Sequence, residues 1–324
     1  MRVGILGAGK IAAVMADTLN RMEGAECAAI GARDWNRAKQ FAGQFGIPAA
    51  YGSYEELASD PALDLIYIAT PHSHHGQHMK LCLSHGKNVL CEKAFTATAK
   101  EAEEVLTLAK EKRLLVAEAI WTRYMPSRSL IGEVMESGIL GEITSLTANL
   151  GYAIRDVERM REPGLAGGAL LDLGVYPINF ALMAFGNEIE NVASTAAFLD
   201  TGVDASDSIT LTWKDGRMAV LHANMCAQTD RRGMIFGDKA YMEVQNINNC
   251  EAIRIYEQPK KGQTGHRLLR EISIPKQITG YEYEILACKK ALQEGKLECE
   301  EMPHAETLRV MRLMDQIREC WKKE

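Results

Sequence analysis

The segment RVGILGAGKIA, residues 2–12, carries the strongest indication of the fold of this chain. Residues 2–6 form a short apolar run, which is typical of a buried strand. Residues 7–12, GAGKIA, fit the pattern G-x-G-x-x-G/A, and apolar residues then recur at helical spacing up to Met22. The glycine pattern directly follows a strand and opens a helix. This context predicts a dinucleotide-binding strand–turn–helix unit.

Each position of this glycine loop has a physical role in holding a pyrophosphate. Gly7 permits the tight turn, Gly9 lets the backbone approach the phosphates, and Ala12 lets the helix pack closely on the strand. Lys10 and Ile11 begin the helix, whose N-terminal N–H groups and dipole favour negative charge. We therefore expect residues 7–12 to bind the cofactor, with an ordinary strand–helix turn as the alternative.

The end of the second strand indicates which dinucleotide is bound. Residues 27–31 are a strand candidate, and NAD-binding sites usually place an acid after this strand to hold the ribose 2′-hydroxyl. Here Arg33 stands at the strand end and Arg37 one helical turn later, and two guanidinium groups suit a 2′-phosphate. Asp34 is the competing residue for NAD, but it serves equally well as a helix N-cap. We expect NADP, with NAD as the alternative.

Strands and helices alternate along the first 120 residues. Further strand candidates lie at 63–69, 88–91 and 114–117, and helix candidates at 34–45, 54–58, 76–84 and 99–112. Such alternation predicts a parallel, doubly wound sheet with helices on both faces. We assign residues 1–120 to a dinucleotide-binding Rossmann domain.

The pattern changes after residue 120. Residues 168–185 read as a long apolar helix, and turn residues separate several strand-like runs between 189 and 274. The expected strands are 141–152, 209–213, 218–224, 234–236, 242–244 and 253–256, and the other expected helices are 127–137, 281–294 and 304–321. This pattern predicts an α+β domain, residues 121–324, in which an open-faced antiparallel sheet carries a packed helix and serves substrate binding and dimerisation.

Composition limits the class of protein and its compartment. The 324 residues are 47% hydrophobic and 25% charged, and the formal net charge of −6 argues against a general nucleic-acid or anionic-membrane binder. The eight cysteines form no C-x-x-C pair and several lie in apolar runs, as expected in a reducing compartment. No signal peptide fits before the glycine loop, and we expect no apolar run long enough to span a bilayer. These features predict a cytoplasmic location.

Histidines cluster after the third strand, in ATPHSHHGQH, residues 69–78. The spacing H-x-H-H-x-x-H resembles a metallo-hydrolase motif, but Gly76 stands where that motif has its aspartate, so we expect no metal. The end of this strand faces the cofactor crevice in a dinucleotide fold. His74 and His78 are expected to be exposed on the following helix. Three residues are expected to contact the cofactor: Thr70, His72 and His75.

A charged pair ends the fourth strand. Glu92 and Lys93 follow the apolar residues 88–91, at the edge where ligands bind in open sheets. A lysine there can touch both the cofactor and a substrate oxygen, so both residues are candidate site residues. The alternative is a lysine whose side chain extends to solvent.

Three polar residues interrupt the apolar helix at 168–185. Asp172, Tyr176 and Asn179 are spaced i, i+4, i+7 and share one helix face. Polar groups on a buried helix need partners, and a polar ligand would supply them. The alternative is a hydrogen-bond network within the core. Pro177 removes one helical hydrogen bond and is expected to kink the helix.

Together these residues resemble the glucose–fructose oxidoreductase and inositol dehydrogenase family. The marks are the glycine loop at 7–12, the pair Glu92-Lys93, and residues 168–176. Within the family, the chain is most similar to the branch of dimeric dihydrodiol dehydrogenases, also called NADP-dependent D-xylose dehydrogenases. The similarity to this branch covers essentially the whole chain and lies in residues 32–34, 51–57, 118–123, 171–176 and 302–312.

The resemblance implies a Rossmann domain followed by an open-faced antiparallel sheet. It implies NADP held by Arg33 and Arg37. It also implies three residues in the cofactor cleft, namely His72, His75 and Trp121.

The resemblance further implies a catalytic pair. Lys93 and Tyr176 would act on the substrate oxygen, with Asp172 beside them. Many family members have histidine at the position of Tyr176, whereas the dihydrodiol branch has tyrosine. The family usually reads Glu-Lys-Pro, and Ala94 here replaces the proline, which we expect to loosen the loop after Lys93.

The expected reaction is hydride transfer between NADP and a hydroxyl-bearing carbon of a sugar or cyclic diol. Tyr176 would donate or accept the proton, the charge of Lys93 would lower the pKa of Tyr176, and Asp172 would orient the pair. The alternatives are a non-catalytic NADP-binding sensor of the same fold and a histidine-metal hydrolase. We expect a homodimer through the C-terminal sheet. The individual sugar or diol is left open by the sequence.

Overall fold

The computed structural model of the chain describes residues 1–259 and 265–322, which form two compact units. The first unit comprises residues 1–124 and 277–312, and the described residues of the second lie within 125–276 and from 313 onward. The division after residue 120 that we drew from the sequence therefore differs from the division by compactness. The difference arises because the chain returns to the first unit at residue 277.

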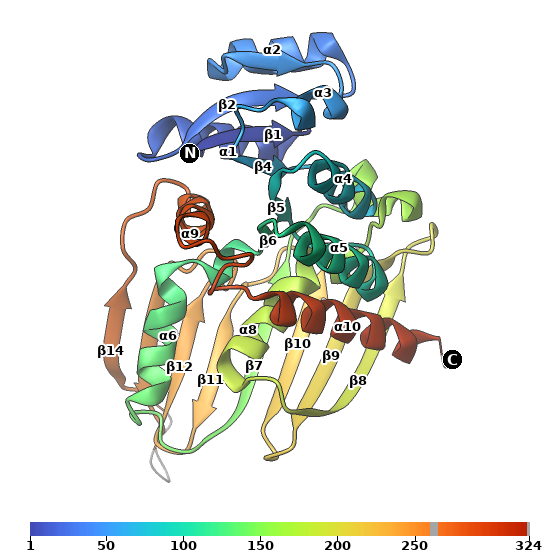
Figure 1. Cartoon of the computed structure of the whole chain (residues 1–324). Helices are drawn as coiled ribbons and strands as arrows, with labels where there is room; N and C mark the ends of the chain where they lie inside the picture. Colours follow the sequence, from blue (N-terminus) through green and yellow to red (C-terminus); the bar gives the residue numbers. More distant parts are fainter. Residues whose placement is uncertain (260–264, 323–324) are drawn as a thin grey trace. The chain divides into compact units, whose positions relative to one another are not determined.

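The first unit is built on a six-stranded parallel sheet with strand order β3-β2-β1-β4-β5-β6, which confirms the doubly wound fold (Figure 1). The order reverses between β1 and β4, where open sheets of this kind form their binding crevice. The strands are β1 (Arg2–Leu6), β2 (Glu26–Gly31), β3 (Ala49–Tyr51), β4 (Leu65–Ile68), β5 (Asn88–Glu92) and β6 (Val116–Ala119). The helices are α1 (Lys10–Arg21), α2 (Trp35–Phe45), α3 (Tyr54–Ser59), α4 (His72–Ser84), α5 (Ala99–Lys112), α9 (Glu282–Gln293) and the first half of α10 (His304–Trp321).

Local signals in the sequence account for most of these boundaries. Ser53 and Thr98 cap α3 and α5, each accepting a backbone N–H from the residue three positions later. Strands β1 and β4 are buried along nearly their whole length, as apolar runs in a parallel sheet should be. The edge strand β3, only three residues long, was not expected, because a run this short carries no readable periodicity.

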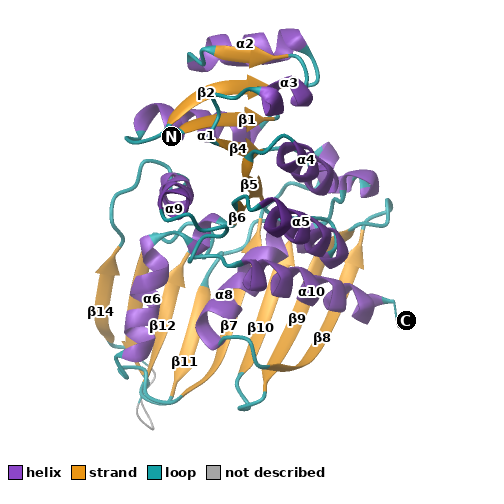
Figure 2. Cartoon of the chain, in the orientation of Figure 1, coloured by secondary structure: helices purple, strands orange, loops and turns teal. Residues whose placement is uncertain are grey.

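The second unit is built on an eight-stranded sheet with strand order β14-β13-β12-β11-β7-β10-β9-β8 (Figure 2). The expected antiparallel pairing holds at every junction except β7–β10, which is parallel. The chain leaves β7 for the far edge at β8 and returns strand by strand, so β10 arrives beside β7 in the same direction. The strands are β7 (Ile143–Gly151), β8 (Ile189–Phe198), β9 (Asp204–Trp213), β10 (Met218–Asn224), β11 (Gly233–Gly237), β12 (Ala240–Gln245), β13 (Ala252–Glu257) and β14 (Leu268–Ser273).

The two faces of this sheet differ in character. Residues Ile209, Leu211 and Trp213 of β9 are at most 1% exposed, and the Trp213 ring packs edge-on against Phe185 at the end of α8 (Val175–Phe185). On β10, Met218 and Val220 are 43% and 44% exposed on the other face. The period of two along a strand therefore separates a covered inner face from an open outer face.

The long apolar helix contains an irregular turn. Leu170–Gly174 form a π-helical turn and α8 follows it directly, so Pro177 lies in the first turn of α8, where the helical register changes. The stretch Pro163–Phe185 is long and apolar enough to cross a membrane, so the expectation that no run reached this length was wrong. Of its most apolar window, 89% is buried inside the structure, as in the core helix of a folded domain.

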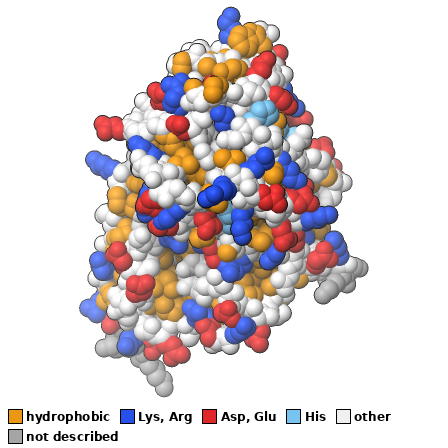
Figure 3. Space-filling view, in the orientation of Figure 1, with side chains coloured by type: hydrophobic (Ala, Val, Ile, Leu, Met, Phe, Trp, Pro, Cys, Tyr) orange, Lys and Arg blue, Asp and Glu red, His pale blue; other side chains and the backbone are white. Residues whose placement is uncertain are grey.

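Charge is distributed over the surface as the composition suggests. On the face shown in Figure 3, Lys and Arg side chains are interspersed with Asp and Glu. Most of the ion pairs join exposed partners, for example Arg2 with Glu26 and Lys80 with Glu104. Pairs of this kind contribute little to stability.

Candidate active site

The glycine loop has the geometry that a pyrophosphate requires. Gly7 has φ +106°, and a Cβ there would lie 2.9 Å from the carbonyl oxygen of Ala69, so no larger residue fits. Gly9 is the N-cap of α1, and a Cβ built on it would have no neighbour nearer than 3.9 Å. The space beside Gly9 is therefore open, and the first turn of α1, which carries no side-chain cap, presents its N–H groups to that space.

Two arginines lie at the carboxyl end of β2. The Arg37 guanidinium donates to the carbonyl oxygen of Ala8 at 2.9 Å, which places it on the glycine loop. Arg33 and Arg37 both act to lower the pKa of Tyr54, against the larger effect of burial, which raises it. The Asp34 carboxylate accepts the Arg37 backbone N–H at 2.9 Å, so its interpretation as a helix N-cap is confirmed.

His75 joins two loops at the edge of the sheet. Its ring is fully buried, with Nδ1 2.9 Å from the carbonyl oxygen of Ala94 and Nε2 2.7 Å from that of Thr70. Burial lowers the pKa of His75 to about 4, although the backbone carbonyls oppose this effect. A neutral imidazole carries one N–H, so the ring donates to one of these carbonyl oxygens and lies against the other, between the end of β4 and the segment after Lys93.

His78 is buried, so its expected exposure was wrong. Its Nδ1 lies 2.9 Å from the Thr70 hydroxyl, and its ring packs edge-on against Tyr54 at 4.7 Å. Burial, with smaller contributions from neighbouring histidines and Arg33, lowers the pKa of His78 to about 4. The cause is the start of α4: the helix begins at His72 rather than at residue 76, which turns the i+3 and i+6 positions inward.

The described residues contain no group of three or more His, Cys, Asp or Glu side chains placed to hold a metal ion. The ring nitrogens of His75 and Nδ1 of His78 instead contact protein atoms.

Lys93 follows a buried acid at the end of β5. Glu92 accepts the Tyr67 hydroxyl and, at 3.2 Å, the backbone N–H of Lys93. Lys93 itself is partly exposed, whereas Ala94 is fully buried and its peptide bond to Lys93 is cis. The Ala94 carbonyl oxygen lies 2.9 Å from Nδ1 of His75, so the residue that replaces the usual proline contacts a buried ring.

Trp121 belongs to a short 3-10 helix, Trp121–Arg123, directly after β6. Its ring is 7% exposed and stacks on Tyr281 with ring centroids 4.4 Å apart and planes inclined by 18°. The first unit thus carries every residue predicted from the sequence to touch the cofactor.

In the second unit, Asp172 lies in the π-helical turn with a side chain only 6% exposed. Arg159, in the short helix α7 (Glu158–Arg161), binds it in bidentate fashion: the two guanidinium nitrogens lie 3.1 and 3.2 Å from the two carboxylate oxygens. Arg159 is half-exposed and was missed in the sequence, where it is one of several arginines in a polar stretch. Only the fold distinguishes it from those neighbours.

Tyr176 and Asn179 follow Asp172 along the helix. Tyr176 is 7% exposed, one turn after Asp172. The Asn179 amide donates to the carbonyl oxygen of Val175 at 2.8 Å within its own helix. This bond agrees with the alternative interpretation of Asn179, a structural role in the core.

Comparison with known proteins agrees with this arrangement. Residues 1–119 match the model of an oxidoreductase family with an NAD-binding Rossmann fold, and residues 130–243 match the GFO/IDH/MocA C-terminal domain. The chain is 33% identical over 324 residues to trans-1,2-dihydrobenzene-1,2-diol dehydrogenase of Danio rerio, covering 98% of this chain and 96% of that protein. The Homo sapiens protein of the same name is 32% identical over 329 residues, covering 99% and 96%.

A solved structure is similar over nearly the whole chain. It is a 3-ketoreductase from Actinomadura kijaniata in complex with NADP and TDP-benzene, with a TM-score of 0.88 at 26% identity, covering 99% of this chain and 98% of that one. The family expected from the glycine loop, Glu92-Lys93 and residues 168–176 is confirmed. The chain therefore belongs to the GFO/IDH/MocA family of oxidoreductases with an NAD-binding Rossmann fold.

Proposed function

We propose that this protein is an NADP-dependent dehydrogenase that acts on a hydroxyl-bearing carbon of a sugar or cyclic diol. The observation that carries the proposal is the position of Arg37 on the glycine loop, with Arg33 beside it, at the place where a 2′-phosphate is recognised. The relatives named as dihydrodiol dehydrogenases and the NADP-bound 3-ketoreductase support it.

The residues of the first unit fit this cofactor. The open space beside Gly9 and the uncapped start of α1 suit a pyrophosphate, and the two arginines suit a phosphate on the ribose. The bound nicotinamide would supply the hydride chemistry. The protein's own task is to hold the reacting groups and to move one proton.

That proton transfer is assigned to Tyr176. In alcohol oxidation, its hydroxyl group would take the proton from the substrate hydroxyl, and in the reverse direction it would return it. A tyrosine in water ionises near pH 10, and a nearby cation favours the phenolate. Lys93 is the proposed cation, and the Asp172–Arg159 pair fixes the turn that precedes Tyr176.

The test is a cofactor titration combined with a substrate panel. Tight quenching or enhancement of NADPH fluorescence, with turnover on a pentose, a hexose or a trans-dihydrodiol in at least one direction, is the expected result. Binding of NADPH without turnover on any member of the panel would favour the alternative of a non-catalytic sensor. Absence of NADPH binding would overturn the proposal.

We infer in addition that the protein is a cytoplasmic homodimer, joined through the outer face of the β7–β14 sheet. Met218 and Val220 are exposed on this face, and an aromatic ladder begins on the other side of β7, where Phe236 and Met218 both pair with Ser145. In that ladder Phe236, Tyr241 and Tyr256 are cross-strand neighbours, with the two tyrosine rings stacked at 5.2 Å. Apolar side chains that are exposed together on one face of a sheet commonly mark an interface.

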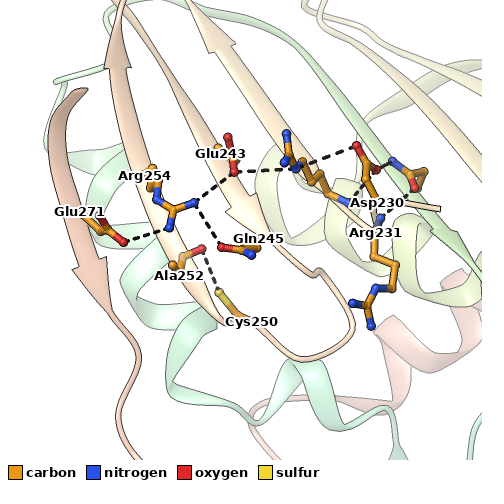
Figure 4. A network of polar contacts seen from close by, with 10 residues as sticks. Asp230, Arg231, Glu243, Gln245, Cys250, Ala252, Arg254 and Glu271 are labelled. Atoms are coloured by element: carbon orange, nitrogen blue, oxygen red, sulfur yellow. Dashed lines mark hydrogen bonds and ion pairs between the residues drawn. The ribbon is translucent and has the colours of Figure 1, made fainter. Parts of the chain in front are cut away.

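The same face carries a polar network, shown in Figure 4. Arg254 bridges Glu243 at 3.6 Å and Glu271 at 3.1 Å, and it donates to the amide oxygen of Gln245 at 3.2 Å. These contacts between neighbouring strands order the side chains of β12, β13 and β14 within a single protomer. A second copy would therefore meet an ordered surface, which lowers the entropic cost of association.

A further inference from the structure

A buried carboxylate anchors the turn that carries Asp172. Asp204, at the start of β9, accepts the backbone N–H of Leu170 at 2.6 Å, and Leu170 is the first residue of the π-helical turn. Gly168 has φ +113°, and a Cβ there would lie 2.1 Å from the other carboxylate oxygen of Asp204. Asp204 thus contacts the chain where it enters the helix of Asp172 and Tyr176.

A β-bulge brings a second acid to the same site. Ser206 pairs with Ala197 and Asp204 with Phe198, so Ala205 is the extra residue in β9. The bulge places Asp204 and Asp207 on one face, although three positions apart they would otherwise point to opposite faces. Asp207 is 1% exposed and Asp204 9% exposed, and their carboxyl groups interact with each other, so the two acids form one buried pair.

The surroundings differ for the two acids. Asp204 receives the Leu170 N–H and is favoured in its charged form by Arg318 of α10, although burial still raises its pKa. Burial and the charge of Asp204 raise the pKa of Asp207 to about 9. From β10, the ring of His222 donates to the backbone carbonyl of Asp207 at 2.8 Å. Asp204 is therefore the charged member of the pair, and Asp207 is the one that holds a proton at neutral pH.

We propose that Asp204 and Asp207 are positioning residues: they share one proton, and the charged Asp204 holds Leu170 so that the following turn presents Asp172 and Tyr176 for the reaction. The effect of this pair on turnover, through Asp172 and Tyr176, rests on the proposed function. Loss of the shared proton at alkaline pH places two negative charges in one buried site. The repulsion then weakens the bond from Leu170 to Asp204 and loosens the turn.

Hydrogen exchange at the Leu170 amide tests the anchor without cofactor or substrate. In the native protein, protection of residues 168–174, corrected for the intrinsic rate, is expected to be constant between pH 7 and 8. Above pH 9 this protection should fall about tenfold or more, because a charge-assisted hydrogen bond is lost. Protection that stays constant to pH 10 would overturn the shared proton.

Two substitutions separate the roles of the acids, and a third is the control. Asp204→Asn should lower the protection at pH 7 about tenfold, because an amide oxygen is a weaker acceptor than a carboxylate. Asp207→Asn imitates the protonated acid, so it should keep the protection at pH 7 and abolish the loss above pH 9. Asp200→Asn, at an exposed aspartate paired with Arg161, should behave as the native protein. An Asp207→Asn variant that loses protection at the native pH would contradict the proposal.

Turnover completes the test. On a substrate accepted in the panel, Asp204→Asn should lower kcat about tenfold and leave the NADP dissociation constant within twofold, since the glycine loop is untouched. If kcat is unaffected while the exchange results are as expected, the pair is a structural anchor and the positioning role is wrong. If no substrate is turned over at all, the proposed function fails, whereas the exchange measurements still decide the anchor.

Discussion

At the residue scale, Arg33 and Arg37 are the residues proposed to determine the choice of cofactor. We expect the double variant Arg33→Ala/Arg37→Ala to weaken NADP binding about 10²-fold or more, because each charge-assisted bond to a phosphate is worth about 1.5–3 kcal/mol. NAD binding should change little, since NAD has no 2′-phosphate. Fluorescence titration with both cofactors measures the ratio. If the native protein binds NAD at least as tightly as NADP, Asp34 is the residue that determines the choice of cofactor.

Tyr176 and Lys93 are expected to depend on each other in the proton transfer. Tyr176→Phe should lower kcat by about 10²–10⁴, the usual range for a lost general acid–base group, and leave NADP binding intact. Lys93→Met should also lower kcat. The loss of kcat in the double variant should be smaller than the two single losses combined. In the native enzyme the oxidation rate should rise with pH along one ionisation that disappears in Tyr176→Phe. Near-native turnover of Tyr176→Phe would make the tyrosine structural.

Arg159 is expected to govern turnover through Asp172. Arg159→Ala removes the bidentate partner of a nearly buried carboxylate, so kcat/KM should fall about 10- to 10²-fold with little change in NADP affinity. Arg159→Lys should restore only part of the activity, because an ammonium cannot bind both oxygens in the same plane. The control is Arg161→Ala, whose partner Asp200 is exposed. Equal losses in the two alanine variants would contradict a specific role for Arg159.

At the element scale, the residue at which α4 begins determines whether two of its histidines are buried, and burial lowers their pKa values. Because α4 begins at His72, His75 and His78 point inward and remain neutral in the folded state, with pKa values near 4. An unfolded histidine titrates near 6.5, so between about pH 6.5 and 4 the unfolded chain binds more protons. Stability is therefore fully present above about pH 6.5 and is lost as the pH falls toward 4.

Urea unfolding of a His78→Gln variant checks this dependence. Between pH 7 and 5 the native protein should lose up to about 2 kcal/mol more stability than the variant for this one side chain. His85→Gln, at an exposed histidine at the end of the same helix, is the matched control and should keep the native loss. If His78→Gln loses as much stability as the native protein, the ring is protonated in the folded state.

At the scale of the whole molecule, the outer face of the β7–β14 sheet is the proposed dimer interface. Val220→Asp places a charge among exposed apolar residues of this face and should shift the protein from dimer to monomer at low micromolar concentration. Leu286→Asp is the matched control, since Leu286 of α9 is equally exposed, at 44%, and belongs to the first unit. Light scattering of native protein and both variants decides the matter. A monomeric native protein would contradict the proposal.

Much of the fold was readable from the sequence because its signals are local. Asp34 marked the start of α2 as an N-cap, and the apolar runs predicted at 2–6 and 63–69 contain the buried strands β1 and β4. The glycine loop is equally local, since a turn, a close approach and a helix start all occur within six residues. The family followed from motifs of the same kind.

The tertiary structure decided what depends on the path of the chain. The sequence does not state that Arg159 meets Asp172, that the bulge at Ala205 sets Asp207 beside Asp204, or that residues 277–312 rejoin the first unit. The parallel β7–β10 pair likewise depends on where β8 to β10 return. Each of these contacts joins residues whose local patterns are ordinary. Their energies arise only when folding removes water and places the partners within hydrogen-bonding distance, so periodicity and spacing along the chain carry no record of them.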